Sequence, residues 1–221
     1  MASSGGGSNG GLRAVMLSPN LIAEPYTGPL PWIPASAFLG AAGWREFYRR
    51  SLGRVRNVNA LAKVSKIPGW TLAKFKAEAM DTYTAVNVAI AAGDETVLRH
   101  RTTESVLAAL KKQLKERQRG GWARVDWALD GLDEATVVQG RVLQPSAESQ
   151  MAWAQLTVEL RSRQRFAAYD AVGKRVAGDM SAGAAVKVVD HWVMERALMP
   201  KLPDALKPWR LAARLTLPQR T

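Results

Sequence analysis

The sequence contains no cysteine, and it has only two histidines, His100 and His191. Without cysteine the chain has no disulfide, no thiolate metal site and no cysteine nucleophile. It also lacks any run approaching the ~18 apolar residues of a membrane-spanning helix, so we expect any contact with a bilayer to be peripheral. Acidic residues are scarce: 31 Lys and Arg stand against 19 Asp and Glu, a net charge of +12. This excess indicates a polyanionic partner, either RNA or an anionic membrane surface, or else a merely basic soluble protein.

The sequence contains no catalytic or metal-binding signature. His100 is expected in a short connection, and neither histidine belongs to a cluster with ligand spacing. Asp190 precedes His191 in an expected strand, where adjacent side chains point to opposite faces and do not easily converge on one substrate. No glycine-rich phosphate loop follows a strand. The acidic residues near a predicted hairpin are ordinary for an exposed turn. We therefore predict a protein that is not an enzyme, with no catalytic residue, metal, cofactor or small-molecule substrate. The acidic residues are Asp126, Asp130, Asp133 and Glu134.

The first 34 residues are rich in glycine, serine and proline. Residues 1–11 predict a flexible segment, and residues 12–34 contain five prolines, which favour an extended chain. An extended segment keeps a fixed form only along another surface. We interpret residues 1–34 as an extended or flexible arm that reaches onto a partner, with a disordered tail as the alternative. Because Arg13 is the only basic residue before Arg45, we expect neither a secretory signal nor a typical import presequence here.

Residues 35–67 predict a basic helical segment in which aromatic side chains alternate with arginines. Residues 1–70 contain eight basic and two acidic residues, a surplus of six charges. Guanidinium groups pair with phosphates and planar rings stack on bases, so this composition indicates RNA contact. An amphipathic helix with a solvated basic face is the alternative. The candidate RNA-binding residues of this segment are Arg45, Arg49, Arg50, Arg54, Arg56, Lys63 and Lys66.

The globular domain is expected to occupy residues 68–221. A long helix with apolar residues three and four apart runs from Leu72 and ends at Gly93. A second helix begins at Thr103, whose side chain can cap it. Cations are favourable near a helix C-terminus, but five basic residues within nine positions exceed that need. We predict a phosphate-facing patch there, formed by Lys111, Lys112, Lys115, Arg117 and Arg119.

After a Gly-Gly pair the pattern changes to the period-two alternation of strands. Turn residues occur at Gly131–Asp133 and Asp170–Gly173. Helices followed by antiparallel strands predict an α+β domain with the helices packed on one face of a curved sheet. The central strand continues into Arg161, Arg163 and Arg165 on one face, which we predict as sheet-face contacts. The expected strands are Trp122–Leu129, Thr136–Leu143, Ala152–Tyr169, Arg175–Asp179, Val186–Ala197 and Trp209–Leu217.

The central strand and its hairpin resemble those of a known family. Gln155–Val158, Ser162–Gln164 and Tyr169–Gly173 are similar to mitochondrial large-subunit ribosomal protein forty-five, a branch of the Tim-forty-four-like domain family. The resemblance covers roughly residues 70–217 and implies an N-terminal extension and helices packed on a strongly bent, cone-shaped antiparallel sheet. The flanking matches are Thr82–Asp94, Ala135–Gln139, Val188–Met194 with Glu195, and Pro208–Leu211.

The resemblance also implies a function and a location. It implies a structural constituent of the mitochondrial large ribosomal subunit near the polypeptide exit, in the matrix at the inner membrane face. The implied partners are large-subunit ribosomal RNA, neighbouring ribosomal proteins, and the inner membrane or its insertase through peripheral contact. One alternative is a peripheral inner-membrane protein of the protein-import motor. Another is an enzyme with a cone-shaped fold of the nuclear-transport-factor type, which needs polar groups inside the sheet, where we expect mostly apolar side chains.

Overall fold

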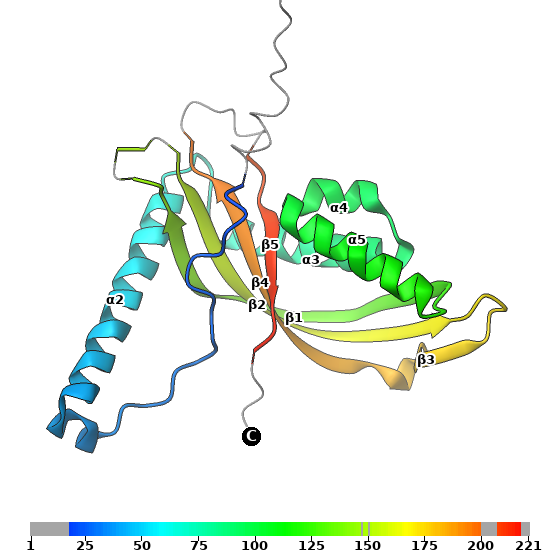
Figure 1. Ribbon diagram of the computed structural model, residues 1–221, viewed down its shortest axis with the longest axis horizontal. Coiled ribbons are helices and arrows are strands. Elements are labelled where there is room, and N and C mark those ends of the chain that lie inside the picture. Colours follow the sequence, from blue (N-terminus) through cyan, green and yellow to red (C-terminus); the bar gives the residue numbers. More distant parts are fainter. Residues whose placement is uncertain (1–17, 147, 150, 200–206, 218–221) are drawn as a thin grey trace, which may run out of the picture.

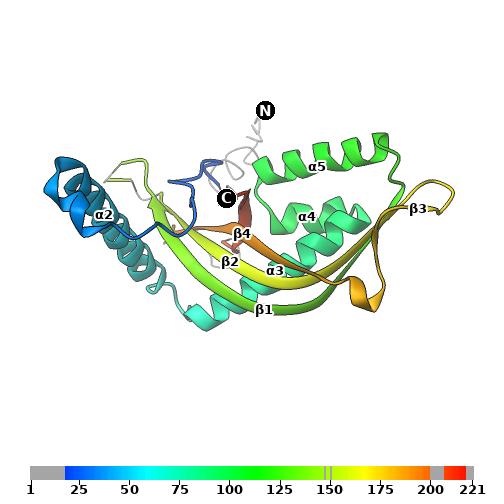
Figure 2. The same cartoon turned by 90° about the horizontal axis from the view of Figure 1, so that it is seen from below.

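The computed structural model describes residues 18–146, 148–149, 151–199 and 207–217. Helices come first along the chain and strands follow, and the helices pack on a curved antiparallel sheet (Figures 1 and 2). The predicted α+β fold is confirmed. The helical elements are the helices α2 (Ala41–Val64), α3 (Leu72–Ala92), α4 (Glu95–Arg101) and α5 (Glu104–Arg119), the 3-10 helix η1 (Ala35–Leu39), and a short 3-10 helix η2 (Ala182–Ala184) between two strands.

The sheet contains five strands in the order β1-β2-β4-β5, and β3 also pairs with β2. Every pairing is antiparallel. The predicted bounds of β3 and β4 agree with the structure, those of β2 and β5 differ by one or two residues, and the two strands predicted at 122–129 and 136–143 form the single strand β1. The strands are β1 (Arg124–Leu143), β2 (Trp153–Tyr169), β3 (Arg175–Asp179), β4 (Val186–Ala197) and β5 (Arg210–Leu215).

The predicted turn at Gly131–Asp133 is wrong, because β1 continues through it as one strand of 20 residues. Its register against β2 shifts between Leu129 and Gly131 and again between Leu132 and Glu134. Such bulges add a residue to one strand, bend it and increase its twist. The glycine and the acidic residues that suggested a hairpin therefore mark the place where the long strand curves.

Helix α3 forms one wall of the core. Its buried side chains include Phe75, Ala79, Tyr83 and Val86, which belong to the same apolar cluster as the inward-facing residues of β2 and β4. Both ends are capped, and the C-terminal glycine cap was predicted. The hydroxyl of its N-cap threonine accepts a hydrogen bond from the amide of the third helical residue, and Gly93 follows the last turn with φ of 75°.

Helix α4 was not predicted. Asp94 begins it by accepting a hydrogen bond from Thr96 N at 2.9 Å, and His100 lies within this helix and not in a connection. The predicted cap of α5 is also wrong in detail. The hydroxyl of Thr103 makes no cap bond to the helix and lies 3.1 Å from the Ser105 hydroxyl.

Residues 18–34, which we call the strap, run as an extended segment across the sheet (Figure 1). Ala23 N donates to Gln155 Oε1 at 2.9 Å, and Gln155 Nε2 donates to Leu21 O at 2.6 Å. The surface that holds the strap in this extended form is the chain's own β2, and the interpretation that the arm reaches onto a partner stays a prediction. The rest of the expected arm, residues 1–17, lies outside the described residues.

The C-terminal half of α2 packs on β1, and its N-terminal half extends past the sheet (Figure 1). Ala60 and Val64 are fully buried. A Cβ on Gly140 of β1 would lie 3.1 Å from the Cβ of Ala60, so the glycine allows this close approach. This geometry leaves the far end of α2 with few contacts to the domain.

Candidate functional site

A groove of about 720 Å³ between the strap and α2 gathers five arginines. Four of them come from successive turns of α2, and the fifth is Arg141 of β1. Adjacent strand residues point to opposite faces, so Arg141 points to the strap while Gly140 faces α2. The groove is the largest concentration of guanidinium groups that we find in the described residues. Its arginines are Arg49, Arg50, Arg54, Arg56 and Arg141.

One carboxylate, Glu24, is among the residues that line this groove. It forms ion pairs with Arg56 and with Arg141, whose Nε lies 2.8 Å from Glu24 Oε2. Burial lowers the pKa of Arg141, and the nearby charge of Arg56 lowers it further. An anion in the groove would therefore relieve repulsion between these arginines.

Glu46 forms ion pairs with two arginines of the groove, Arg49 and Arg50. Arg49 makes two hydrogen bonds of 2.7 Å to its carboxylate, and Arg50 Nε makes a third of 2.7 Å. The bonds from Arg49 and then Arg50 lower the pKa of Glu46 to about 2. Arg50 also donates to Pro31 O of the strap at 2.5 Å. These contacts fix the direction of both guanidinium groups and leave donors free for a ligand.

The structure does not bring the remaining α2 candidates into the groove. Arg45 is exposed near the far end of α2. Lys63 lies at the opposite end of the helix, where its Nζ donates to Gln144 Oε1 at 3.3 Å. Lys66 is exposed just beyond the last turn.

The predicted cations of α5 lie at the end of the sheet opposite to α2 (Figures 1 and 2). Lys112, Lys115 and Arg119 are exposed. Lys111 pairs with Glu95 of α4 at 2.6 Å, and the carboxylate pKa is lowered mainly by that hydrogen bond. The two predicted basic regions are therefore separate surfaces at the two ends of one curved sheet.

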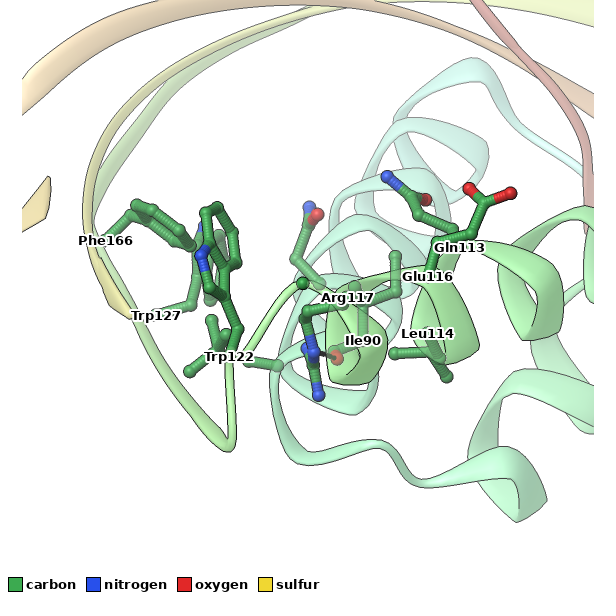
Figure 3. A pocket seen from close by; sticks show the side chains of 12 residues that line it. Ile90, Gln113, Leu114, Glu116, Arg117, Trp122, Trp127 and Phe166 are labelled. Carbon is green, nitrogen blue, oxygen red and sulfur yellow. Dashed lines mark hydrogen bonds between the residues drawn. The ribbon is translucent and has the colours of Figure 1, made fainter. Parts of the chain in front are cut away.

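Arg117 points away from the other α5 cations, into the wall of an apolar cavity of about 500 Å³ (Figure 3). Its Nη1 donates to Ile90 O at 2.8 Å, and burial lowers its pKa. Trp122, Trp127 and Phe166 form the facing wall. The cavity suits an apolar group beside a cation. No pattern in the sequence predicts this cavity, because its lining comes from α3, α5, β1 and β2.

Arg161, Arg163 and Arg165 share one face of β2, as predicted, and each is paired with a carboxylate. The acidic partners of two of them come from the bulged part of β1. This face is thus close to charge balance, and the acidic residues there serve as ion-pair partners. The pairs are Arg161 with Glu159 at 2.7 Å, Arg163 with Asp133 at 3.5 Å, and Arg165 with Asp130 at 2.6 Å.

The inner face of the sheet holds a polar cluster that sequence reasoning missed. Tyr83 OH of α3 donates to Asp190 Oδ2 at 2.6 Å and lies 3.1 Å from Ser162 Oγ. Gln164 donates to both hydroxyl groups. Burial and the hydrogen bond to Asp190 raise the pKa of Tyr83. The cluster is internally satisfied, so it holds α3 on the sheet and does not present a free acid or base.

His191 lies on the opposite face from Asp190, as expected. Its Nε2 is 3.1 Å from Glu159 Oε2, and its ring stacks on Tyr26 of the strap. Across the described ranges, no group of three or more His, Asp or Glu side chains has the arrangement of a metal site. Within the same residues, no helix combines the length and apolarity needed to cross a membrane.

A comparison with known families gives a match to the Tim44-like domain over residues 59–215. The matched segment begins in the part of α2 that packs on β1 and ends with β5. No curated protein matches the chain. The match supports the family noted from Gln155–Val158 and its neighbours, and the ribosomal branch stays a prediction. Because the matched segment is well over half of the 221 residues, the chain belongs to the Tim44-like domain family.

Proposed function

We propose that this chain is a non-catalytic constituent of the mitochondrial large ribosomal subunit near the polypeptide exit. In this role it binds ribosomal RNA and helps to tether the ribosome to the inner membrane. The family match supports the membrane side of the proposal, because the Tim44-like family is associated with the matrix face of that membrane. The observation that carries the RNA side is the groove, in which five arginines face one lining carboxylate.

The groove suits a phosphate backbone and not a particular base sequence. Planar guanidinium groups bind phosphate oxygens in pairs, and the phosphate contacts position a protein without reading sequence. The exposed cations of α5 supply a second anchoring surface at the other end of the sheet. A rigid sheet with a basic surface at each end would hold two RNA segments at a fixed separation.

Exposed side chains near the N-terminal end of α2 support membrane contact. Trp32 of the strap and Leu39 of η1 are 90% and 91% exposed. Tryptophan is typical of the membrane interface, and an exposed leucine gains free energy there. Basic residues near an anionic membrane surface, such as Arg45, contribute about 1 kcal/mol each.

The alternative is a peripheral inner-membrane protein of the protein-import motor. The same family match and the same exposed Trp32 and Leu39 favour it. The two functions differ in the ligand of the arginine groove, because a component of the import motor needs no ribosomal RNA. Ribosome association therefore separates the two functions.

Charge reversal in the two basic surfaces tests the proposal. The variants R49E/R54E and K111E/K112E/K115E should each reduce incorporation into the large subunit, measured as the fraction of tagged protein that sediments with it. The control K174E/R175E/K187E reverses three exposed cations near the β3 hairpin and should incorporate normally. Normal incorporation of both test variants would reject the RNA contacts, and recovery of the wild type in membranes without ribosomes would favour the import motor.

A further inference from the structure

Helix α2 carries an apolar row that faces away from the sheet, which we call the outer seam. Val55 and Val58 in it are 64% and 67% exposed. Ala60, buried against β1, comes two positions after Val58, about 200° round the helix, so the seam and the packed side are opposite. The seam residues follow one another at spacings of four and three. They are Trp44, Tyr48, Ser51, Val55, Val58 and Ala62.

The spacing of the outer seam is that of a helix–helix contact. A row that alternates steps of three and four stays on one side of a helix and inserts between the side chains of a second helix. The seam is about 27 Å long at 1.5 Å per residue, which matches a partner helix of about five turns. Valine has a lower helix propensity than most residues, so the two exposed valines add little to the helix itself and offer apolar surface to a partner.

Two polar groups of the seam are already hydrogen-bonded within the chain and do not oppose docking. The hydroxyl of Ser51 donates to Phe47 O at 2.9 Å within the helix. The indole of Trp44 donates to Phe38 O of η1 at 3.0 Å. Residues that are small at the centre and aromatic at one end would let a second helix approach closely along most of the seam.

The charges beside the outer seam indicate which charge a partner helix should carry. Arg45 and Arg54 flank it, and no acidic residue does. Glu46 is the one acidic residue of α2, and its carboxylate is held by Arg49 and Arg50 on the groove side. The fitting occupant therefore has acidic residues beside its own apolar row.

Other occupants fit this surface less well. A second copy would bring Arg54 and its basic neighbours against an equally basic helix. RNA phosphates would find no donor along the row from Val55 to Ala62. Helices that lie in a membrane interface present bulky apolar side chains along their whole length, whereas those of α2 lie in its N-terminal half and only Val55, Val58 and Ala62 continue the seam beyond it.

We propose that the outer seam binds an amphipathic helix of a partner protein whose apolar row is flanked by aspartate or glutamate. The proposal does not depend on ribosome or membrane association. The seam lies on the side of α2 away from the arginine groove, and Arg54 lies at the border between the two surfaces.

Two labelled helical peptides test the proposal on the full chain. They share one apolar row of five turns, and glutamate flanks it in the first and lysine in the second. The glutamate peptide should bind, and the lysine peptide should bind at least ten-fold more weakly. The variant V55D/V58D should weaken binding of the glutamate peptide by about thirty-fold, as expected for loss of the centre of an interface.

Val88→Asp is the matched control, because Val88 is an exposed valine of α3 outside the seam. It should bind the glutamate peptide like the wild type, and urea unfolding should show that both variants are folded. Equal binding of the two peptides, or unchanged binding by V55D/V58D, would overturn the proposal. A wild-type dimer that V55D/V58D abolishes would assign the seam to a second copy. Selective loss of binding to anionic vesicles in V55D/V58D would assign it to the membrane.

Discussion

Helices α2 and α3 have similar lengths, 24 and 21 residues, but opposite relations to the domain. Six residues of α3 are buried, and these include Phe75 and Tyr83. In α2 the buried residues are Gly43, Ala60 and Val64, none with a large aromatic side chain. The aromatic residues of α2 are instead exposed, and arginines surround them. Apolar periodicity thus identifies a helix in both cases, but it does not tell whether the apolar side contacts this chain or another molecule.

The largest effect should come from removing a core aromatic residue of α3. Phe75 is 1% exposed, and its ring centroid lies 4.6 Å from that of Trp209. Phe75→Ala should lower the free energy of unfolding by about 3–5 kcal/mol. Phe47→Ala on α2, where the side chain is 47% exposed, should cost under about 1.5 kcal/mol. Urea unfolding measures both values, and equal losses would show that α2 packs as tightly as α3.

Removing one hydroxyl group gives a smaller contrast between the two helices. Tyr83→Phe leaves Asp190 without its 2.6 Å hydrogen bond in the inner cluster, so it should cost about 1–3 kcal/mol of unfolding free energy. Tyr48→Phe on the exposed side of α2 should change it by less than about 0.5 kcal/mol. A neutral Tyr83→Phe would mean that the cluster does not hold α3 on the sheet.

The sheet face beneath the strap holds a buried carboxyl group, Glu195, whose titration should make stability depend on pH. Burial raises the pKa of Glu195 above 4.5, although hydrogen bonds from Ser18 and from Gln155, the latter at 2.7 Å, oppose this. A raised pKa means that the folded state binds more protons than the unfolded state. Stability should therefore fall as the pH rises from about 4.5 through the folded-state pKa, with a slope of at most about 1.4 kcal/mol per pH unit.

Glu195→Gln removes this titration. The melting temperature of the variant should depend less on pH above 4.5 than that of the wild type, and thermal unfolding across that range compares the two. Parallel curves for both proteins would show that Glu195 has the same pKa in the folded and unfolded states.

The smallest expected effect is a gain in the free energy of unfolding instead of a loss. Val55→Ala and Val58→Ala replace exposed β-branched residues of α2, so each should stabilise the isolated chain by roughly 0.5 kcal/mol through helix propensity. Val86→Ala, in the core side of α3, should instead destabilise it by about 2 kcal/mol. A loss of stability in the α2 variants would mean that another part of this chain covers the seam.

The alternation of apolar and polar residues, together with turn residues at the strand ends, allowed most of the sheet to be predicted from the sequence. The bounds predicted for β3 and β4 agree with the structure, and the aromatic and aliphatic spacing identified α3. The bend of β1 was mistaken for a turn, since Gly131 and the acidic residues near it have the same local chemistry in a hairpin and in a bulge. The missing information was the long partner strand, which lies more than 20 residues away in the chain.

The candidate site shows the same limit. Four arginines of the groove follow from the basic pattern of α2, but Arg141 joins them only because the strand pleat turns it toward the strap. Arg117 belongs to a basic run in the sequence, yet the fold turns it to Ile90 and the apolar cavity. Residue type and spacing predict which side chains carry charge. The direction of each side chain depends on distant elements.

Sedimentation of a mitochondrial lysate through sucrose gradients at low and at high salt tests whether the protein is a constituent of the large ribosomal subunit. Phosphate contacts weaken with salt, so the comparison separates an integral subunit from a loosely held protein. We expect the wild-type protein to sediment with the large ribosomal subunit at both salt concentrations. Its absence from ribosomes at low salt, with recovery in the membrane fraction, would reject a ribosomal role and favour the import motor.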